Sequence, residues 1–351
     1  MEAIFTGSTT MVNGKPVIIY PGLCNKQSWA DCQTGTLLAV ATPADLTDPL
    51  LVNWTKPGYN PIMNNTQRDP STAWQTSTGE WRLTTYDTSV YTSKDFVRWT
   101  VASGTSGFAH GECPSFFPLP GGPSPSTGAT HVHKASYGGK DWMQVGRYDE
   151  GPPGTTGNWT GVLPAVLIDA GDFYASKDFY DSAKDRRINW GFAKVPPAST
   201  QTLPRVVTWD ESLKQLVFAP AEELQNLREQ QLLNVQGQQV PAGGSLWLGG
   251  GWAGSAGNQS EVFVTVRLPA HSATVTLHVA AGVAAGAATN ASTSVNFRYE
   301  AGSNNLSVNI GQPGGQLTQY MPHTDLPGGN FVRSTLPRSW RTNLQLLLAC
   351  L

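Results

Sequence analysis

The stretch Arg68-Asp69-Pro70-Ser71-Thr72-Ala73-Trp74 opens a unit of strand, polar turn and aromatic strand. A Ser-Thr-Gly turn comes next, and the aromatic strand then runs over residues 81–86. The same plan returns at Cys113-Pro114-Ser115-Phe116-Phe117-Pro118 and at Asp172-Phe173-Tyr174-Ala175, about 44 and then about 60 residues further along. This spacing suits the four-stranded blades of a β-propeller, while a row of ordinary hairpins in a β-sandwich is the alternative.

The rest of the chain is also rich in strand signals. Only residues 220–233 look helical, with leucines at near-helical spacing after two early glutamates. Beyond them, apolar and polar residues alternate strictly over 262–268, 275–279 and 295–299, which is typical of half-buried antiparallel strands. We therefore predict an all-β protein: a propeller over residues 1–218, a linker helix over 219–233 and a partial β-sandwich over 234–351.

Composition excludes several classes of protein. Charged residues make up 14% of the chain and the net charge is −2, with no basic run that would bind a nucleic-acid backbone. No apolar stretch reaches the roughly 18 residues that a membrane helix needs. With 39% hydrophobic residues and 12 Trp, the chain is neither disordered nor a coiled coil. We expect no nucleic-acid partner and no membrane insertion.

The cysteines and histidines give no sign of a metal site or a cofactor. The four cysteines, Cys24, Cys32, Cys113 and Cys350, fit no zinc pattern. Cys24 and Cys32 can close a short loop in an oxidising compartment, and unlinked buried thiols fit equally well. His131 and His133 share one face of a strand but lack further ligands at suitable spacing, so we expect them to pack at the surface or in loops.

Two short motifs are suited to chemistry. Arg68-Asp69-Pro70 and Glu112-Cys113-Pro114 each open a repeat, and a propeller brings such openings to the rim of one channel. A glycosidase needs two carboxyl groups there, one to donate a proton to the leaving oxygen and one that stays ionised. An adjacent arginine keeps Asp69 ionised. Taken singly, each motif is also compatible with an ordinary turn.

Over residues 4–235 the chain resembles glycoside hydrolase family 32, and within it the plant-type acid invertases (β-fructofuranosidases). Both motifs above match that family in order, and so do several further stretches: Gly14-Lys15-Pro16-Val17-Ile18-Ile19-Tyr20, Ala44-Asp45-Leu46-Thr47-Asp48-Pro49-Leu50-Leu51, Ser93-Lys94-Asp95-Phe96, Phe173-Tyr174-Ala175-Ser176-Lys177 and Arg186-Arg187-Ile188-Asn189-Trp190-Gly191. The resemblance implies a five-bladed propeller with its first blade incomplete, followed by a β-sandwich. It also implies hydrolysis of terminal β-fructofuranosides, such as sucrose or fructan, with retention.

The resemblance assigns roles to individual residues. Glu112 corresponds to the general acid/base, with Cys113 beside it in the position that tunes the acid. Asp69 corresponds to the aspartate that holds sugar hydroxyls and stabilises the transition state. The remaining implied substrate-binding residues are Arg68 beside Asp69, Phe5, Thr6 and Ser8 in the fructose pocket, and Asp149 on the leaving-group side.

The sequence departs from the family pattern at its beginning. The family's nucleophile lies in an Asn-Asp-Pro-Asn motif, and this sequence contains none. We therefore expect either an N-terminally truncated chain or a homologue that binds fructosides without cleaving them, and a fructosyltransferase is a third alternative.

The compartment is indicated only weakly. Pro114 resembles the cell-wall subgroup, and six Asn-x-Ser/Thr sequons favour a cell-wall or vacuolar protein, although no signal peptide precedes Met1. The sequons are at Asn53, Asn64, Asn158, Asn258, Asn290 and Asn305.

Overall fold

Among the described residues, nearly all of the regular secondary structure is β-strand. The computed structural model describes residues 3–24, 35–169, 171–195, 198–246, 260–267, 270–280, 292–300, 305–311, 317–320 and 343–350. The chain divides into two compact units, Met1–Pro220 and Ala221–Leu351. No helix among the described residues is long and apolar enough to cross a membrane.

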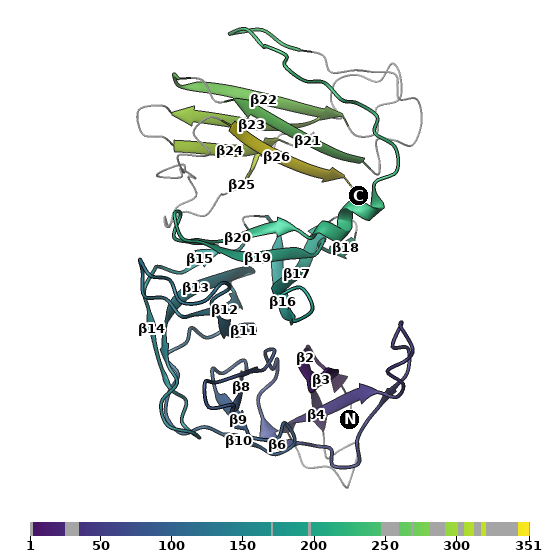
Figure 1. The fold of residues 1–351 in the computed structure, drawn as a ribbon, viewed down its shortest axis with the longest axis vertical. Helices are drawn as coiled ribbons and strands as arrows, with labels where there is room; N and C mark the ends of the chain where they lie inside the picture. Colours follow the sequence, from purple (N-terminus) through teal and green to yellow (C-terminus); the bar gives the residue numbers. More distant parts are fainter. Residues whose placement is uncertain are drawn as a thin grey trace. The chain divides into compact units, whose positions relative to one another are not determined.

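Four antiparallel sheets make up the first unit (Figure 1). Sheet 1 has the order β1-β3-β4-β5, with β2 on β3 and β6 on β4: β1 (Ala3–Ile4), β2 (Ser8–Val12), β3 (Lys15–Cys24), β4 (Gly35–Pro43), β5 (Trp54–Thr55) and β6 (Met63–Thr66). Sheet 2 has the order β10-β9-β8-β7: β7 (Trp74–Gln75), β8 (Trp81–Thr84), β9 (Val90–Ser93) and β10 (Trp99–Val101).

The third and fourth sheets repeat the plan. Sheet 3 has the order β11-β12-β13-β14, with β15 on β13: β11 (Glu112–Pro118), β12 (His131–Tyr137), β13 (Lys140–Asp149), β14 (Asn158–Gly161) and β15 (Val166–Leu167). Sheet 4 has the order β16-β17-β19-β20, with β18 on β17: β16 (Phe173–Asp181), β17 (Arg186–Val195), β18 (Ala198–Gln201), β19 (Arg205–Asp210) and β20 (Gln215–Pro220).

Each consecutive pair of sheets shares a hydrophobic core. Sheets 1 and 2 enclose Val17, Ile19, Leu38, Val40, Leu83, Tyr91 and Trp99; sheets 2 and 3 enclose Trp74, Val90, Phe116, Tyr148 and Trp159; sheets 3 and 4 enclose Phe117, Val132, Met143, Phe173, Val207 and Leu216. Removing one such large side chain from water contributes about 1.5–3 kcal/mol. Sheets that pack face to face in chain order are the blades of a propeller.

The four sheets correspond to four blades. Ala3–Ile4, the first strand, pairs with β3 (Ala3 opposite Leu23) and so belongs to sheet 1. Among the described residues of the first unit, no further sheet corresponds to the predicted incomplete first blade.

His131 and His133 are not surface or loop residues. Both are buried in the core between sheets 2 and 3, where the His133 ring stacks on Phe108 at 4.3 Å and the His131 ring lies 4.8 Å from that of Trp74. The period-two alternation of β12 points both side chains to the same face, and here that face is covered by sheet 2.

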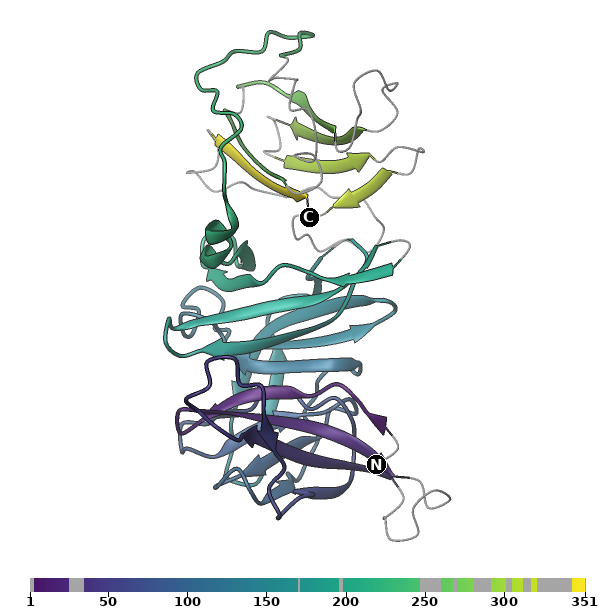
Figure 2. The same ribbon diagram turned by 90° about the vertical axis from the view of Figure 1, so that its right-hand side faces the viewer.

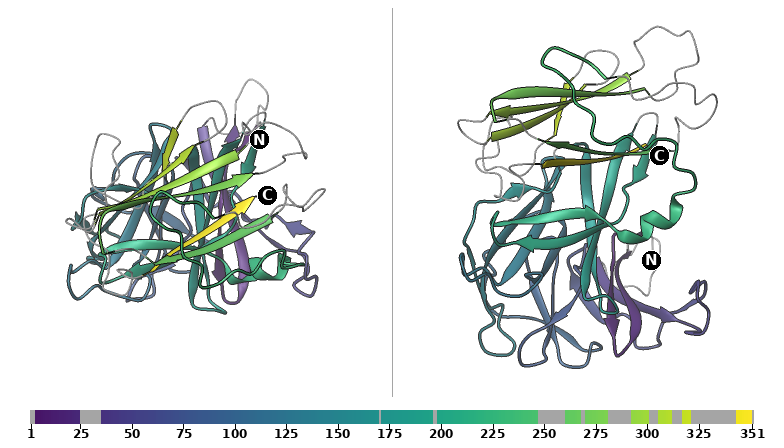
Figure 3. Two further views of the ribbon diagram at one scale, coloured as in Figure 1. Left: turned by 90° about the horizontal axis from the view of Figure 1, so that it is seen from above. Right: turned by 45° about the horizontal axis from the view of Figure 1, so that its top comes forward.

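The described residues of the second unit form two antiparallel sheets that follow a short helical turn. The helical structure is a 3₁₀-helix over Glu222–Leu227, shorter than the predicted 219–233, and none of its residues is buried. A helix without a packed face gains little from lengthening. β21 (Ser260–Arg267) pairs with β26 (Asn343–Cys350), and the other sheet has the order β22 (Ala273–Ala280), β23 (Ser292–Glu300), β24 (Asn305–Gly311), β25 (Leu317–Tyr320). The two sheets form separate layers (Figures 2 and 3).

Candidate active site

The first strands of sheets 2, 3 and 4 (β7, β11 and β16) begin close to one another, at one end of the first unit. Arg68 and Asp69 precede β7, Glu112 begins β11, and Tyr174 is the second residue of β16. β2 of sheet 1 reaches the same end, because the Ser8 hydroxyl donates to the Pro70 carbonyl at 2.6 Å. The sheets thus bring together residues that lie far apart in the sequence.

Arg68 joins the two predicted carboxylates. Its Nη1 lies 3.2 Å from Asp69 Oδ2, and its Nη2 lies 2.9 Å from Glu112 Oε1. The guanidinium also lies over the Tyr86 ring, 4.4 Å from its centroid, which fixes its plane. One cation is thus shared between two carboxylates from different repeats.

Asp69 is fixed and hidden from solvent. Only 1% of the residue is exposed, and its Oδ2 accepts a hydrogen bond from the Cys113 backbone N–H at 3.1 Å. A carboxylate held in this way suits a fixed set of hydrogen bonds better than movement toward a reacting carbon.

The backbone is unusual at the start of these strands. Asp69, Cys113 and Ala175 have φ of 60°, 46° and 53°, in the left-handed region that residues other than glycine seldom adopt. Each follows a residue whose side chain belongs to the candidate active-site cluster: Arg68, Glu112 or Tyr174. We use 'the cluster' for Arg68, Asp69, Glu112, Tyr174 and Lys177. The left-handed residue turns the chain sharply there, and such local strain is common at functional sites.

Glu112 has two strong donors. Tyr174 Oη donates to Oε2 at 2.5 Å, and Arg68 donates to Oε1. These hydrogen bonds, that of Tyr174 first, hold the pKa of the Glu112 carboxyl below its usual value. The side chain is 37% exposed, so a ligand can reach it. In this arrangement both donors favour the ionised form of Glu112, whereas a general acid has to carry a proton.

Cys113 does not contact Glu112 through its thiol. The thiol is free and buried, burial raises its pKa, and it hydrogen-bonds with the Thr6 side chain. Cys113 is linked to the other motif through its backbone N–H, which donates to Asp69.

The predicted pocket residues of sheet 1 divide into two groups. Ser8 is tied to Pro70 and Thr6 to Cys113, so both adjoin the cluster. Gly7 between them is required, because a Cβ there would lie 2.5 Å from the Ile19 carbonyl oxygen. Phe5 is 43% exposed, and its backbone N–H donates to Pro21. Among the described residues we find no contact of Phe5 with the cluster.

Asp149 lies at the wrong end of sheet 3, which corrects the prediction. The hairpin at residues 138–139 reverses the chain, so Glu112, Ser136 and Asp141 are neighbours in register, and Asp149 pairs with Asn158 at the far end of β13. At about 3.3 Å per residue, Asp149 is about 26 Å along the strand from Asp141. It lines an open hollow with residues such as Ser103, Thr105, Thr155 and Asn158.

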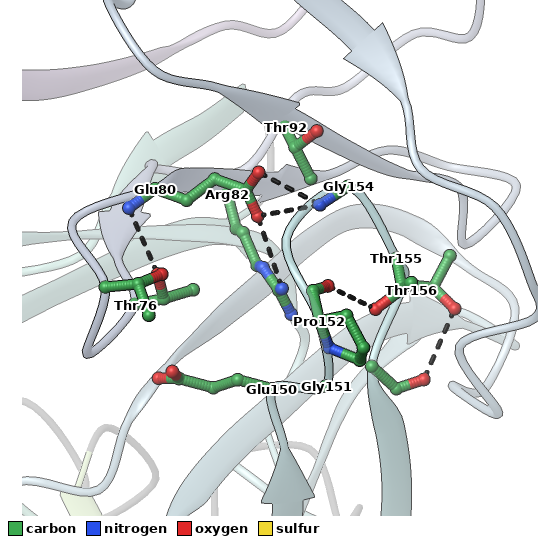
Figure 4. Close-up of polar contacts among 12 residues, drawn as sticks. Thr76, Glu80, Arg82, Thr92, Glu150, Gly151, Pro152, Gly154, Thr155 and Thr156 are labelled. Carbon is green, nitrogen blue, oxygen red and sulfur yellow. Dashed lines mark hydrogen bonds and ion pairs between the residues drawn. The ribbon is translucent and has the colours of Figure 1, made fainter.

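The far end of sheets 2 and 3 is held by its own buried ion pair (Figure 4). Arg82 Nη2 lies 3.3 Å from Glu80 Oε2, and the Glu80 carboxylate accepts the Gly154 N–H at 3.0 Å. Arg82 also donates to the Tyr148 hydroxyl. These contacts hold the loop that contains Gly154 against sheet 2, so their role at this end of the sheets is structural.

Two residues of the cluster were not predicted to belong to it, Tyr174 and Lys177. Lys177 Nζ donates to the same Pro70 carbonyl as Ser8, at 3.1 Å. The available signal was the repeat itself, since Phe173-Tyr174-Ala175 opens its unit as Glu112-Cys113 opens the unit before. Within the described part of the chain, no group of three or more His, Cys, Asp or Glu could hold a metal ion.

Blades that bring two carboxylates and an arginine to one end have the architecture of a glycoside hydrolase. The family model described as the glycosyl hydrolases family 32 N-terminal domain matches residues 1–220. The chain belongs to glycoside hydrolase family 32. The predicted all-β fold with a propeller is thereby confirmed.

Relatives agree with this assignment. An insoluble-isoenzyme β-fructofuranosidase of Arabidopsis thaliana is 35% identical over 77% of this chain and 54% of its own length. Insoluble isoenzyme 6 of Oryza sativa subsp. japonica is 32% identical over 75% of this chain and 51% of its own. The crystal structure of fructan 1-exohydrolase IIa from Cichorium intybus matches 88% of this chain and 67% of that chain, with a TM-score of 0.62 and 25% identity. The chain thus spans about half the length of the curated relatives it matches.

Proposed function

We propose that this protein acts on terminal β-fructofuranosides, sucrose or fructan, with Glu112 as general acid/base and Asp69 and Arg68 as ligands of the sugar hydroxyls. One observation carries the proposal: Arg68 bridges Asp69 and Glu112 at 3.2 and 2.9 Å, so the two motifs meet at one place. The names of the relatives support the substrate class, since they are β-fructofuranosidases and, at 31% identity, a fructan 6-exohydrolase of Triticum aestivum.

Proton transfer sets the order of events at Glu112. Before the glycosidic bond breaks, Glu112 has to carry a proton for the leaving oxygen. Because Arg68 and Tyr174 favour the ionised form, a bound sugar that takes over one of these donors would favour protonation of Glu112. Arg68 is the one that a sugar hydroxyl can engage, since a third of its side chain is exposed. After the bond breaks, the ionised Glu112 is already suited to take a proton from water.

A second function is favoured by the same observation. Glu112 held as an ionised acceptor, together with the absence of an Asn-Asp-Pro-Asn motif from these 351 residues, fits a homologue that binds fructosides without cleaving them. By the family pattern, turnover requires the nucleophile that this motif supplies.

Binding and turnover measured side by side test both functions. Calorimetry with fructose and sucrose on the 351-residue chain should show binding that Arg68→Ala weakens, with no fructose released. An N-terminal extension carrying an Asn-Asp-Pro-Asn segment should restore release, and Glu112→Gln should then lower kcat by about 10²–10⁴-fold. Failure of both forms to bind or cleave fructosides would overturn the proposal, and release by the 351-residue chain alone would overturn the binding-only alternative.

We further propose a cell-wall location, with the vacuole as the alternative. The relatives named insoluble isoenzymes support it. Three of the six sequons lie on described residues with assigned exposure, and Asn53, Asn64 and Asn158 are all exposed. Protein extracted from its source should lose mass after treatment with a peptide N-glycosidase, and an unmodified mass would contradict the proposal.

A further inference from the structure

Two of the first strands are interrupted at matching places. In β11 the pairing with β12 skips from Glu112 opposite Ser136 to Ser115 opposite Lys134, and in β16 the pairing with β17 skips from Tyr174 opposite Phe192 to Lys177 opposite Trp190. These are β-bulges, whose extra residues leave the hydrogen-bond ladder. Glu112 and Tyr174 stand directly before the two bulges, so the bulges decide where their side chains point.

Buried backbone groups that leave a ladder need other partners. Lys134 and Asp141 provide them for both bulges. Lys134 Nζ donates to the Cys113 carbonyl at 3.0 Å and to the Ser176 carbonyl at 2.7 Å. Asp141 Oδ2 accepts the Ser176 N–H at 2.8 Å. One pair of side chains therefore binds the bulge of sheet 3 and the bulge of sheet 4 together.

The pair itself is buried and ionic. Lys134 Nζ lies 3.1 Å from Asp141 Oδ2, with the two side chains 3% and 0% exposed. Lys134 also donates to the Ser136 hydroxyl at 2.8 Å. Removing two charges from water costs several kcal/mol, so such a pair adds little stability compared with apolar residues of the same size. Its hydrogen bonds instead specify one geometry of the two strands.

We propose that Lys134 and Asp141 are positioning residues that lock the two bulges in register, so that Tyr174 Oη meets Glu112 Oε2. Both side chains are buried. Lys134 acts through the backbone of Cys113 and Ser176, and Asp141 acts through that of Ser176. The importance of this arrangement for catalysis rests on the proposed function, but the positioning role of Lys134 and Asp141 can be tested without measuring turnover.

The test is the titration of Glu112 in the 351-residue chain, followed by NMR of carboxyl-¹³C-labelled glutamate. Glu112→Gln identifies the signal, and Tyr174→Phe sets the shift caused by loss of the tyrosine donor. The variant K134M/D141N removes both charges together, so that no single buried charge is left. We expect it to raise the pKa of Glu112 by about half a unit or more, toward the Tyr174→Phe value.

A matched control is the buried ion pair at the other end of the sheets. The variant E80Q/R82M should lower the melting temperature while leaving the Glu112 titration unchanged. If K134M/D141N also lowers only the melting temperature, the pair is merely structural and the proposal is overturned. Should K134M/D141N fail to fold, Asp141→Asn alone serves, because it keeps an acceptor for Ser176 but weakens the hold on Lys134; an unchanged Glu112 titration there would overturn the proposal.

The result of this titration can be distinguished from the result of the fructoside-binding test. A shifted Glu112 titration in a chain that binds no fructoside would support the lock and contradict the function. In a form that turns over, the pair variant should lower kcat with KM nearly unchanged, as a positioning role requires.

Discussion

The backbone N–H of Cys113 donates to Asp69 Oδ2 at 3.1 Å, which joins the residue after Glu112 to the residue after Arg68. The two residues are 44 positions apart and belong to different repeats of the chain. Because Asp69 is 1% exposed, water cannot replace either partner. The geometry of the candidate acid therefore depends on a carboxylate that precedes the neighbouring sheet.

Asp69→Ala should lower the free energy of unfolding by about 1–3 kcal/mol, since it leaves the buried Cys113 N–H without an acceptor. Urea denaturation with a fluorescence readout measures this. Asp149→Ala is the matched control, because Asp149 is exposed, and its effect should stay within about 0.5 kcal/mol. Equal effects of the two substitutions would contradict the role of Asp69.

Asp149→Ala should also leave fructoside binding unchanged. The side chain lies at the end of β13 away from Glu112, too far to reach a sugar held by Arg68. Calorimetric titration with fructose should give the same Kd as for the unsubstituted chain, whereas Arg68→Ala should weaken binding. A several-fold loss of affinity in Asp149→Ala would show that this residue belongs to the sugar site.

Stability should fall below pH 6.5 because of the two core histidines. Burial lowers the pKa of His131 to about 4 and that of His133 to about 3, whereas in the unfolded chain each takes a proton near pH 6.5. Between these values the unfolded state binds more protons, so the free energy of unfolding decreases as the pH drops. The slope is up to about 1.4 kcal/mol per pH unit for each histidine.

His133→Phe tests this pH dependence, because a phenyl ring can still stack on Phe108. Unfolding free energies measured between pH 7 and pH 4.5 should show a slope smaller by about one proton than in the unsubstituted chain. An identical slope would mean that His133 titrates alike in both states.

Cys113 should resist alkylation in the folded protein. Its thiol is buried, and burial raises its pKa, so little reactive thiolate is present near neutral pH. Mass spectrometry after iodoacetamide treatment should find Cys113 unmodified in buffer and modified in urea. Rapid labelling without denaturant, or a disulfide at Cys113, would refute this.

The proximity of Asp69 and Glu112 could be predicted from the sequence because strand openings recur at matched positions. A repeat of strand, turn and strand sends the start of each unit to the same end, so the spacing predicts that Asp69 and Glu112 meet. The same logic applied to Phe173-Tyr174 would have added Tyr174. The prediction for Asp149 is wrong because the Gly138-Gly139 hairpin, visible in the sequence, puts Asp141 rather than Asp149 beside the Glu112 end.

Other features depend on contacts that no local pattern encodes. Alternation put His131 and His133 on one face of a strand, but only the packing of sheet 2 decides that this face is core. The disulfide alternative for Cys24 and Cys32 involves residues 25–34, which lie outside the described part of the chain. The bulges at Cys113 and Ala175 are likewise set by Lys134 and Asp141, which lie in strands other than the two that they shape.

The left-handed backbone at Asp69, Cys113 and Ala175 restricts which mutations these positions tolerate. A β-branched residue at such a φ is strongly disfavoured, while glycine, asparagine and aspartate enter at little cost. Intolerance to substitution there would consequently reflect the path of the main chain as much as any contact with sugar. Ala175 is the clearest case, because its side chain has no polar atom to offer a ligand, yet replacing it by valine would displace the neighbouring Tyr174.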